Sequence, residues 1–221
     1  MYIKNLDIAN FRNYKKQSVA LSDGLNVFMG RNAQGKTNLL EAVCLCSIGK
    51  SPRTPRDKEL IRWEETRARV KVDVATRAGT ESVDIILDKT ENKRVAVNSL
   101  PITRMGELMG VVSTVFFSPD EIKVVSSSPA ARRQFIDIAL CQMSRAYFYA
   151  LQRYDKILSQ RNKLLKSGRV TDDALEVWDI QLSECGAKII KTRRGFVSRL
   201  APFANENHGF LTSEAENLEL S

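Results

Sequence analysis

The stretch that decides the fold reads Gly30-Arg31-Asn32-Ala33-Gln34-Gly35-Lys36-Thr37. It matches the pattern G-x-x-x-x-G-K-[ST], in which glycines let the backbone wrap phosphate oxygens and a lysine neutralises their charge. A short apolar, β-prone run lies before it at residues 25–29, and apolar residues with helical spacing follow from residue 38 to residue 48. We therefore predict a strand, a phosphate-binding loop and a helix ended by a left-handed Gly49.

The candidate nucleotide-binding residues of this stretch are Gly30, Asn32, Ala33, Gln34, Gly35, Lys36, Thr37 and Asn38. We expect successive backbone N–H groups of the loop to surround phosphate oxygens at the positive end of the helix dipole. Lys36 would neutralise the β and γ phosphates, and the hydroxyl of Thr37 would ligate magnesium. The pattern makes nucleotide binding the leading hypothesis.

The net charge of +8 is concentrated in one part of the chain. Residues 122–200 contain 15 Lys and Arg against 7 Asp and Glu, whereas the rest of the sequence has 19 of each sign. A basic surface of this kind attracts polyanions, although it also serves as a solvated face or as a docking site for an acidic protein. We predict nucleic acid as the partner of this segment.

The four cysteines and the single histidine argue against several kinds of site. No C-x-x-C pair occurs, and His208 is the only imidazole, so zinc sites, disulfides and histidine-based hydrolysis are all poorly supported. We expect reduced, buried thiols. The N-terminus does not resemble a signal peptide, and no apolar run approaches the length of a membrane span, so we predict a cytoplasmic protein without membrane contact.

Alternating apolar and polar residues predict an antiparallel sheet in the first half of the chain. The segments are residues 1–20, which form two strands around a polar turn, and residues 69–75, 81–88, 94–97 and 111–117. Short turns separate most of these segments, so we expect antiparallel strands rather than a series of crossover units.

In the second half of the chain the period of the apolar residues becomes helical. Ser128-Pro129 supplies a cap and a first-turn proline, and the spacing continues to about Lys166, with Arg145-Ala146 as an alternative break. Thr171 would cap a second helix that ends before Pro202. We expect the two helices to pair as an antiparallel hairpin. A continuous first helix would extend over roughly 55 Å and project as an arm.

Five stretches of the sequence together resemble the RecF family of bacterial recombination mediators, and the resemblance covers essentially the whole chain. The stretches are Asn10-Phe11-Arg12-Asn13-Tyr14, the phosphate-binding loop followed by Leu39-Leu40-Glu41-Ala42, Ser128-Pro129-Ala130-Ala131-Arg132-Arg133-Gln134-Phe135, Gln160-Arg161-Asn162-Lys163-Leu164-Leu165 and Trp178-Asp179. RecF proteins resemble the heads of SMC-type ATPases, a branch of the ABC class, with a helical lobe where SMC proteins carry their coiled coil. The resemblance implies an α/β fold with an ABC/SMC-head-like P-loop nucleotide-binding lobe, an antiparallel β subdomain and an inserted helical arm.

The same resemblance implies a division of the chain into three parts. Residues 1–125 would form the N-terminal half of the ABC-type ATPase lobe with its antiparallel β subdomain, and residues 126–204 would form the helical arm. Residues 205–221 would be a return segment toward the C-terminal part of the ATPase lobe, which we expect to be missing from this chain.

The family's activity gives expectations for cofactors and partners. RecF proteins bind ATP and Mg²⁺, form ATP-dependent homodimers, and bind double-stranded DNA and single/double-strand junctions. They work with RecR and RecO to load RecA at gaps in damaged DNA. We therefore expect an ATP-dependent DNA-binding protein of repair and recombination.

Further site residues follow from the resemblance. Arg12 and Asn13 would lie near the base and the ribose, with a solvated turn as the alternative for Arg12. Asp120 or Ser118, where SMC relatives have a glutamine loop, would reach the metal, with a turn or helix start as the alternative. Arg53 would sense phosphate or DNA, or form a structural ion pair.

The expected arm also carries candidates for contacts to DNA or to a protein partner. These are Arg132, Arg133, Arg153, Arg161, Arg193 and Arg194. For each one, a solvated or ion-paired face is the commoner role.

A Walker B strand and a serine-glycine signature are both absent from the pattern. Ile85-Ile86-Leu87-Asp88 resembles the former, but Lys89 follows in place of Glu, and the segment belongs to the expected antiparallel set. Complete family members are weak DNA-dependent ATPases. Without an acidic pair and the opposing signature, we expect this chain to bind nucleotide weakly and to hydrolyse it negligibly.

Two other classes of function stay open. The first is a P-loop enzyme of another class, such as a GTPase or a small-molecule kinase, although Asn92-Lys93-Arg94-Val95 lacks the aspartate of the guanine-reading N-K-x-D. The second is a helical module that docks a protein such as RecR and does no nucleotide work. Nucleotide competition and salt titration separate these classes from the leading hypothesis.

Overall fold

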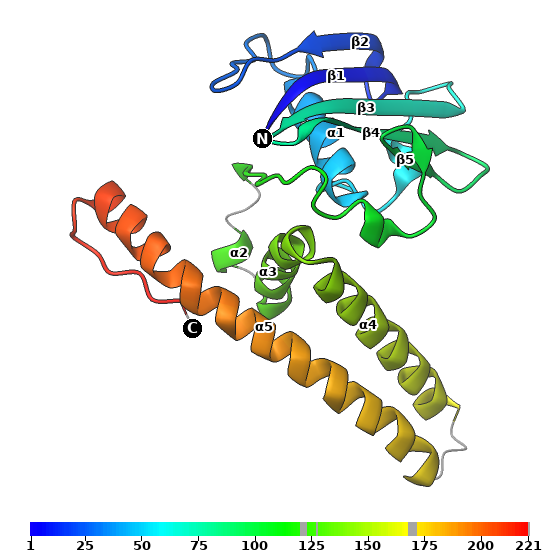
Figure 1. Cartoon of the computed structure of the whole chain (residues 1–221), viewed down its shortest axis with the longest axis vertical. Coiled ribbons are helices and arrows are strands. Elements are labelled where there is room, and N and C mark those ends of the chain that lie inside the picture. The colour runs from blue at the N-terminus through cyan, green and yellow to red at the C-terminus, as the bar shows by residue number, and fades with distance from the viewer. Residues whose placement is uncertain (120–122, 127, 168–171, 221) are drawn as a thin grey trace. The chain divides into compact units, whose positions relative to one another are not determined.

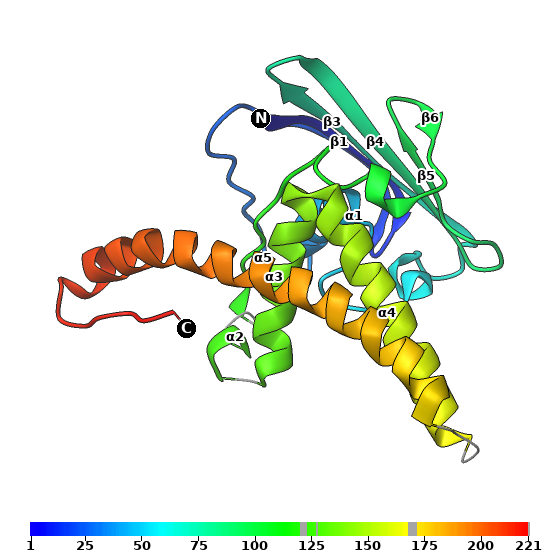
Figure 2. The same cartoon turned by 60° about the horizontal axis from the view of Figure 1, so that its bottom comes forward.

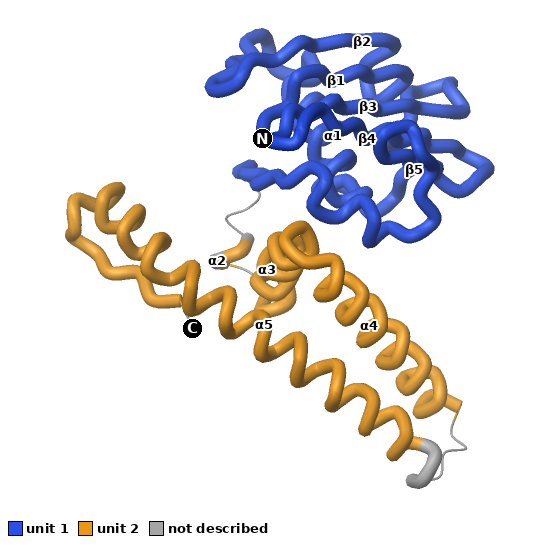
Figure 3. The backbone as a smooth tube through the Cα atoms, viewed as in Figure 1, with its two compact units in different colours: residues 1–121 blue, residues 122–221 orange. Residues whose placement is uncertain are grey.

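The structure, a computed structural model, describes residues 1–119, 123–126, 128–167 and 172–220 of the chain. The chain divides into two compact units, residues 1–121 and residues 122–221, which are coloured separately in Figure 3. The first unit contains the sheet and the phosphate-binding loop, and the elements described in the second are all helices.

Unit 1 is built on a six-stranded antiparallel sheet with the strand order β2-β1-β3-β4-β5-β6, of which Figure 1 labels β1 to β5 and Figure 2 labels β6. The strands are β1 Tyr2–Phe11, β2 Tyr14–Ala20, β3 Arg67–Thr76, β4 Gly79–Asp88, β5 Arg94–Val97 and β6 Leu100–Pro101. Ile8 lies opposite Val70, which lies opposite Ile85, and all three are buried. Because side chains alternate across each strand, this apolar face packs toward the core and the other face is polar. The antiparallel sheet that the sequence predicts is confirmed.

Helix α1, Lys36–Ile48, packs on β3 and β4 of the sheet. It ends at Gly49, whose φ of 69° is left-handed and whose N–H donates to the carbonyl of Leu45 at 2.8 Å. A Cβ at Gly49 would overlap the Met105 side chain, so the position requires glycine for space as well as for backbone angle. The predicted helix and its glycine stop are confirmed.

Two of the predicted strands are wrong, because residues 25–29 and 111–117 form no strand in the structure. Leu25, Val27 and Met29 expose 88%, 68% and 88% of their surface, and Val115 and Phe117 expose 92% and 79%. An apolar, β-prone segment becomes a strand only when a neighbour completes its hydrogen bonds. No strand of the described sheet pairs with either segment.

Two short 3₁₀ turns, Asp57–Leu60 and Met105–Glu107, complete the regular structure described in unit 1. The turn at Asp57–Leu60 leads into Ile61, which forms an isolated antiparallel bridge with Phe11 at the end of β1. Both side chains of this bridge are buried. The chain is thereby fixed beside the turn that joins β1 to β2.

The regular structure described in unit 2 is helical, and the chain after the last helix, residues 213–220, forms turns and coil (Figure 2). The helices are α2 Lys123–Ser126, α3 Pro129–Met143, α4 Arg145–Lys166 and α5 Asp172–Thr212. Helices α4 and α5 lie side by side, with Ile157, Cys185 and Ile189 buried. The antiparallel hairpin that the sequence predicts is confirmed. The predicted cap at Thr171 lies outside the described residues.

The first predicted helix of this unit is not continuous from Pro129 to Lys166. It begins as expected, with Ser128 before a first-turn proline, but it is interrupted at Ser144, one residue before the alternative break. The Ser144 hydroxyl accepts a hydrogen bond from the backbone N–H of Tyr147 at 3.2 Å and so caps α4. A local side-chain cap of this kind competes with continuation of the preceding helix.

The predicted end of the second helix before Pro202 is also wrong. Helix α5 continues through Pro202 to Thr212, so the first part of the expected return segment, residues 205–212, is helical. Proline removes one N–H from the helical ladder. In a helix of 41 residues the remaining hydrogen bonds hold the structure together.

The four cysteines are buried free thiols, as the sequence predicts. Burial, followed by the charge of Asp84, raises the pKa of the Cys46 thiol far above its usual range, which keeps it protonated. None of the helices in the described ranges combines the length and the apolar composition that crossing a bilayer requires.

Candidate nucleotide-binding site

The phosphate-binding loop curls around the ammonium group of its own lysine. Gly30, Ala33 and Gly35 have φ values of 152°, 64° and 100°, so the backbone turns through left-handed conformations along the loop. Lys36 Nζ donates to the carbonyl oxygens of Gly30 at 2.7 Å and Arg31 at 2.8 Å. The positive charge is therefore held within the loop, in front of α1.

The loop is accessible from solvent where a phosphate chain would lie. Asn32, Ala33 and Gln34 are exposed, and the Thr37 side chain at the start of α1 is exposed as well. Backbone amides at a helix N-terminus bind anions, and a threonine hydroxyl is a suitable oxygen ligand for Mg²⁺. The structure thus brings the predicted loop residues together at the start of one helix.

Asn13, in the turn between β1 and β2, ties that turn to the loop. Its Nδ2 donates to the carbonyl of Gln34 at 3.1 Å, and its Oδ1 accepts from Asn38 Nδ2 at 2.8 Å. A Cβ built on Gly35 would lie 2.6 Å from Asn13 Oδ1, so only glycine allows this approach. Asn13 is therefore next to the loop, and its contact with a ribose stays a prediction.

Arg12 forms an ion pair with the buried carboxylate of Glu41, a residue that the sequence did not predict as part of the site. Its Nε donates to Glu41 Oε2 at 2.9 Å and its Nη2 to Glu41 Oε1 at 2.6 Å, while Nη1 donates to the carbonyl of Glu59 at 3.0 Å. The solvated-turn alternative is therefore wrong for this side chain. A contact between Arg12 and a base stays a prediction.

Arg53 joins the same carboxylate, which confirms the structural ion pair weighed for it. Its Nη1 donates to Asn38 Oδ1 at 2.8 Å and to Glu41 Oε2 at 3.1 Å. Ser51 Oγ donates to Glu41 Oε1 at 2.6 Å. The side chain of Glu41 has 0% exposure, so its charge is balanced by the guanidinium groups of Arg12 and Arg53 rather than by water, and the Ser51 hydroxyl adds a neutral hydrogen bond.

Burial raises the pKa of Glu41, but other effects outweigh it. Hydrogen bonds from Arg12 and Ser51, with the charges of Arg12 and Arg53, bring the pKa of this carboxyl below its ordinary value. Glu41 is therefore ionised at neutral pH. The sequence signal that could have found it is a single acidic residue within the apolar run Leu39-Leu40-Glu41-Ala42.

Asp88 has a structural role, which agrees with rejecting Ile85-Ile86-Leu87-Asp88 as a Walker B strand. The segment lies in β4 of the antiparallel sheet. Asp88 Oδ1 accepts from the backbone N–H of Thr90 at 2.8 Å, and Oδ2 accepts from Arg67 Nε at 2.5 Å. These hydrogen bonds hold the pKa of Asp88 far below its usual range, and the largest effect comes from the backbone N–H of Thr90.

The arm arginines fall into two groups. Arg161 pairs with Asp179 at 2.5 Å and Arg193 pairs with Asp137 at 2.7 Å, so the ion-paired alternative describes these two. The side chains of the other candidates are exposed: Arg132, Arg133, Arg153 and Arg194. The predicted metal ligand Asp120 lies outside the described residues, and Ser118 is half-buried.

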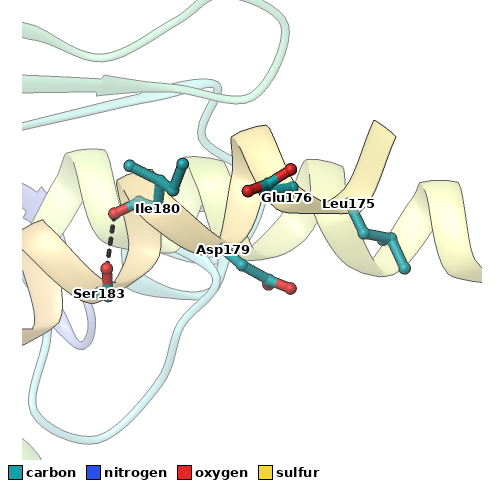
Figure 4. Close-up of a pocket in the computed structure, with 5 residues that line it drawn as sticks. All are labelled: Leu175, Glu176, Asp179, Ile180 and Ser183. Carbon is teal, nitrogen blue, oxygen red and sulfur yellow. Dashed lines mark hydrogen bonds between the residues drawn. The ribbon is translucent and has the colours of Figure 1, made fainter. Parts of the chain in front are cut away.

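A shallow hollow on α5 of unit 2 lies apart from this site in the sequence (Figure 4). Its lining residues all come from one helix: Leu175, Glu176, Asp179, Ile180 and Ser183. The Ser183 hydroxyl donates to the carbonyl of Ile180 at 2.8 Å, and the carboxylates of Glu176 and Asp179 lie further along the helix.

The lysine-centred loop before α1, carried on an antiparallel sheet, defines a P-loop nucleotide-binding lobe. The family model described as "AAA domain" matches residues 5–200, and the chain belongs to that family.

Curated relatives confirm the resemblance to RecF. The chain is similar to "DNA replication and repair protein RecF" from Clostridium perfringens (strain 13 / Type A), with 42% identity over 219 residues, and from Clostridium novyi (strain NT), with 44% identity over 219 residues. Each alignment covers 99% of this chain and 61% of the relative. The chain thus spans about three fifths of the length of the curated relatives it matches.

Solved structures confirm the fold class. Structures of "the recombination mediator protein RecF-ATP" and "RecF-ATPrS", both "in RecFOR pathway", match with TM-scores of 0.92 and 0.91 and identities of 35% and 34%. Each match covers 99% of this chain and 59% of the other. A structure of SMC ATPases matches with a TM-score of 0.53 at 21% identity over 62% of this chain, which shows a shared fold.

Proposed function

We propose that this chain binds ATP with Mg²⁺ at the phosphate-binding loop and takes part in bacterial recombinational DNA repair. The observation that carries the proposal is the placement of Lys36 Nζ inside the loop, 2.7 Å from the carbonyl of Gly30. The likeness to a RecF-ATP structure at a TM-score of 0.92 supports adenine nucleotide as the ligand. The solved RecF structures are described as "in RecFOR pathway", and we propose that ATP-dependent DNA binding by this chain serves RecR and RecO in loading RecA at gaps.

The residues present fit a triphosphate and its metal. Backbone amides from Asn32 to Lys36 would hold phosphate oxygens, and Lys36 would transfer its hydrogen bonds from carbonyls to the β and γ phosphates. Thr37 would hold Mg²⁺, which supplies charge neutralisation when bound. Asn13 would steady the loop from the β1–β2 turn.

Hydrolysis by this chain should be negligible. Glu41 is a carboxylate beside the loop, but both of its oxygens already accept hydrogen bonds from Arg12, Ser51 and Arg53. Its pKa is also below the ordinary value of a glutamate. A carboxylate in that state is a poor base for activating water. We propose that ATP acts in this chain as a ligand, and that nucleotide-dependent pairing of two copies belongs to the complete protein.

Binding of labelled ATP with Mg²⁺ and with EDTA tests the nucleotide assignment. We expect ATP to bind with Mg²⁺ and to bind markedly more weakly with EDTA, because the Thr37 hydroxyl acts through the metal. Unlabelled GTP should compete no better than ATP. A strong preference for GTP would instead support a P-loop enzyme of another class, and no saturable binding of either nucleotide would contradict the proposal.

Exposed arm arginines should give part of the affinity for duplex DNA. We expect Arg153→Glu with Arg194→Glu to weaken DNA binding and to reduce the slope of log affinity against log salt by roughly 0.9 for each phosphate that the variant no longer neutralises. Arg77→Glu with Lys16→Glu, two charge reversals on exposed residues of unit 1, is the control for net charge. Fluorescence anisotropy of labelled duplex across a salt series measures the effect.

A protein-docking arm is the second candidate function. Phe203, Phe210 and Leu211 on the C-terminal part of α5 expose 65%, 85% and 80% of their surface, which suits an apolar partner. Unchanged DNA binding in the arginine variants, with little fall in affinity as salt rises, would favour docking over DNA binding by this arm.

A further inference from the structure

We propose that Glu41 is a positioning residue for nucleotide binding, which holds Arg12 and Arg53 against the phosphate-binding loop without touching the nucleotide. This inference rests on the proposed function of the loop. Glu41 lies within α1, four residues after Thr37, and its carboxylate is turned into the protein rather than toward solvent.

A continuous series of hydrogen bonds connects Glu41 to the loop. Arg53 Nη1 bridges Glu41 Oε2, at 3.1 Å, and Asn38 Oδ1, at 2.8 Å. Asn38 Nδ2 then donates to Asn13 Oδ1 at 2.8 Å, and Asn13 Nδ2 donates to the carbonyl of Gln34 at 3.1 Å. A change at Glu41 therefore reaches the backbone of the loop in four steps.

Glu41 also fixes Arg12 in an unfavourable backbone conformation. Arg12 has a φ of 53°, a left-handed angle that is strained for a non-glycine residue and persists only where its surroundings impose it. Two hydrogen bonds to Glu41, with the backbone N–H of Arg12 donating to the carbonyl of Leu60 at 2.7 Å, impose it here. Without the carboxylate, the guanidinium keeps only the hydrogen bond from Nη1 to the carbonyl of Glu59 at 3.0 Å.

The charges of the cluster suit a triphosphate. Two guanidinium groups share one carboxylate, so the cluster keeps a net positive charge beside the loop. The Arg53 side chain is 44% exposed and that of Arg12 is 21% exposed, so both extend toward solvent from a buried anchor. Removing the anchor would free both cations to move away from the loop.

Two substitutions separate the charge of Glu41 from its volume. Glu41→Gln keeps the shape and removes the charge, whereas Glu41→Asp keeps the charge and shortens the side chain by one methylene. If Glu41 acts by holding arginines, the Asp variant binds ATP more tightly than the Gln variant. If Glu41 only fills space, the order is reversed, because the Asp variant leaves a cavity.

Equilibrium binding of labelled ATP with Mg²⁺ tests the inference, with folding checked by circular dichroism. We expect Glu41→Gln to weaken binding about 10-fold and Glu41→Asp to recover most of the affinity. Glu64→Gln, the same chemical change at an exposed position of unit 1, is the matched control and should bind as the unaltered chain does. If Glu41→Gln does not fold, the Asp variant carries the test, and a folded Asp variant with strongly weakened binding overturns the inference.

A double-mutant cycle with Arg12→Gln tests whether Glu41 acts through its partner. We expect the pair Arg12→Gln with Glu41→Gln to weaken ATP binding by less than the product of the two single reductions, because one of the two guanidinium groups that Glu41 orients is already absent and only Arg53 remains to be released. Fully additive reductions in affinity would overturn the inference. Failure of the unaltered chain to bind ATP would instead refute the proposed function itself, so the two failures are distinguishable.

Discussion

Lys36→Ala should lower the affinity of this chain for Mg²⁺-ATP by about 100-fold. The ammonium group is already held within the loop by the carbonyls of Gly30 and Arg31, so little reorganisation precedes its contact with phosphate. Hydrogen bonds to charged groups contribute roughly 1.5–3 kcal/mol each, and about 2.7 kcal/mol corresponds to a factor of 100 in affinity. Equilibrium binding of labelled ATP measures the reduction.

Lys50→Ala is the matched control for that variant. Lys50 is exposed and lies just beyond the other end of α1, so it changes the net charge of unit 1 equally without touching the loop. We expect its ATP affinity to stay within about twofold of the unaltered chain. Magnesium-dependent binding that persists in Lys36→Ala would show that the nucleotide lies elsewhere.

Asp137→Ala should lower the free energy of unfolding of unit 2 by about 2–3 kcal/mol. Asp137 in α3 accepts from the Tyr147 hydroxyl of α4 at 2.5 Å and from Arg193 of α5 at 2.8 and 2.7 Å, so it joins three helices. Its removal leaves a largely buried guanidinium and a buried hydroxyl without this partner. The side chains of Arg193 and Asp137 are 22% and 15% exposed, so the loss of unfolding free energy should be smaller than for a fully buried ion pair.

Urea unfolding followed by fluorescence in a Trp63→Phe background measures this cost, because the remaining Trp178 lies in α5 and reports on unit 2. Glu184→Ala is the control, since Glu184 is an exposed acidic residue of the same helix. We expect its unfolding midpoint to stay close to that of the unaltered chain. Equal midpoints for the Asp137 and Glu184 variants would show that the three-helix junction adds nothing to stability.

The features that the sequence predicts well are those that neighbouring residues determine. The phosphate-binding loop, α1 and its stop at Gly49 depend on glycine backbone freedom and on helical spacing within one short stretch. The paired strands of the sheet follow from period-two alternation for the same reason. Nothing distant has to be known to place them.

The features that the sequence predicts poorly depend on contacts with distant residues. Residues 25–29 and 111–117 have strand composition, but no described strand pairs with them. Proline is typical of the end of a helix, yet α5 continues through Pro202. Glutamate is a residue type that is usually exposed, and only the approach of Arg12 and Arg53 explains the burial of Glu41. In each case the partner, and not the local pattern, decides the outcome.

The uncovered residues Leu25, Val27 and Met29, with Val115 and Phe117, bear on how the chain behaves at high concentration. Both runs present alternate apolar side chains to water and contain no proline or charge between the exposed positions. Segments of this kind template intermolecular β-pairing. Self-association of the isolated chain should therefore start at these two runs, and lysine substitutions there would act as gatekeepers that keep it dispersed.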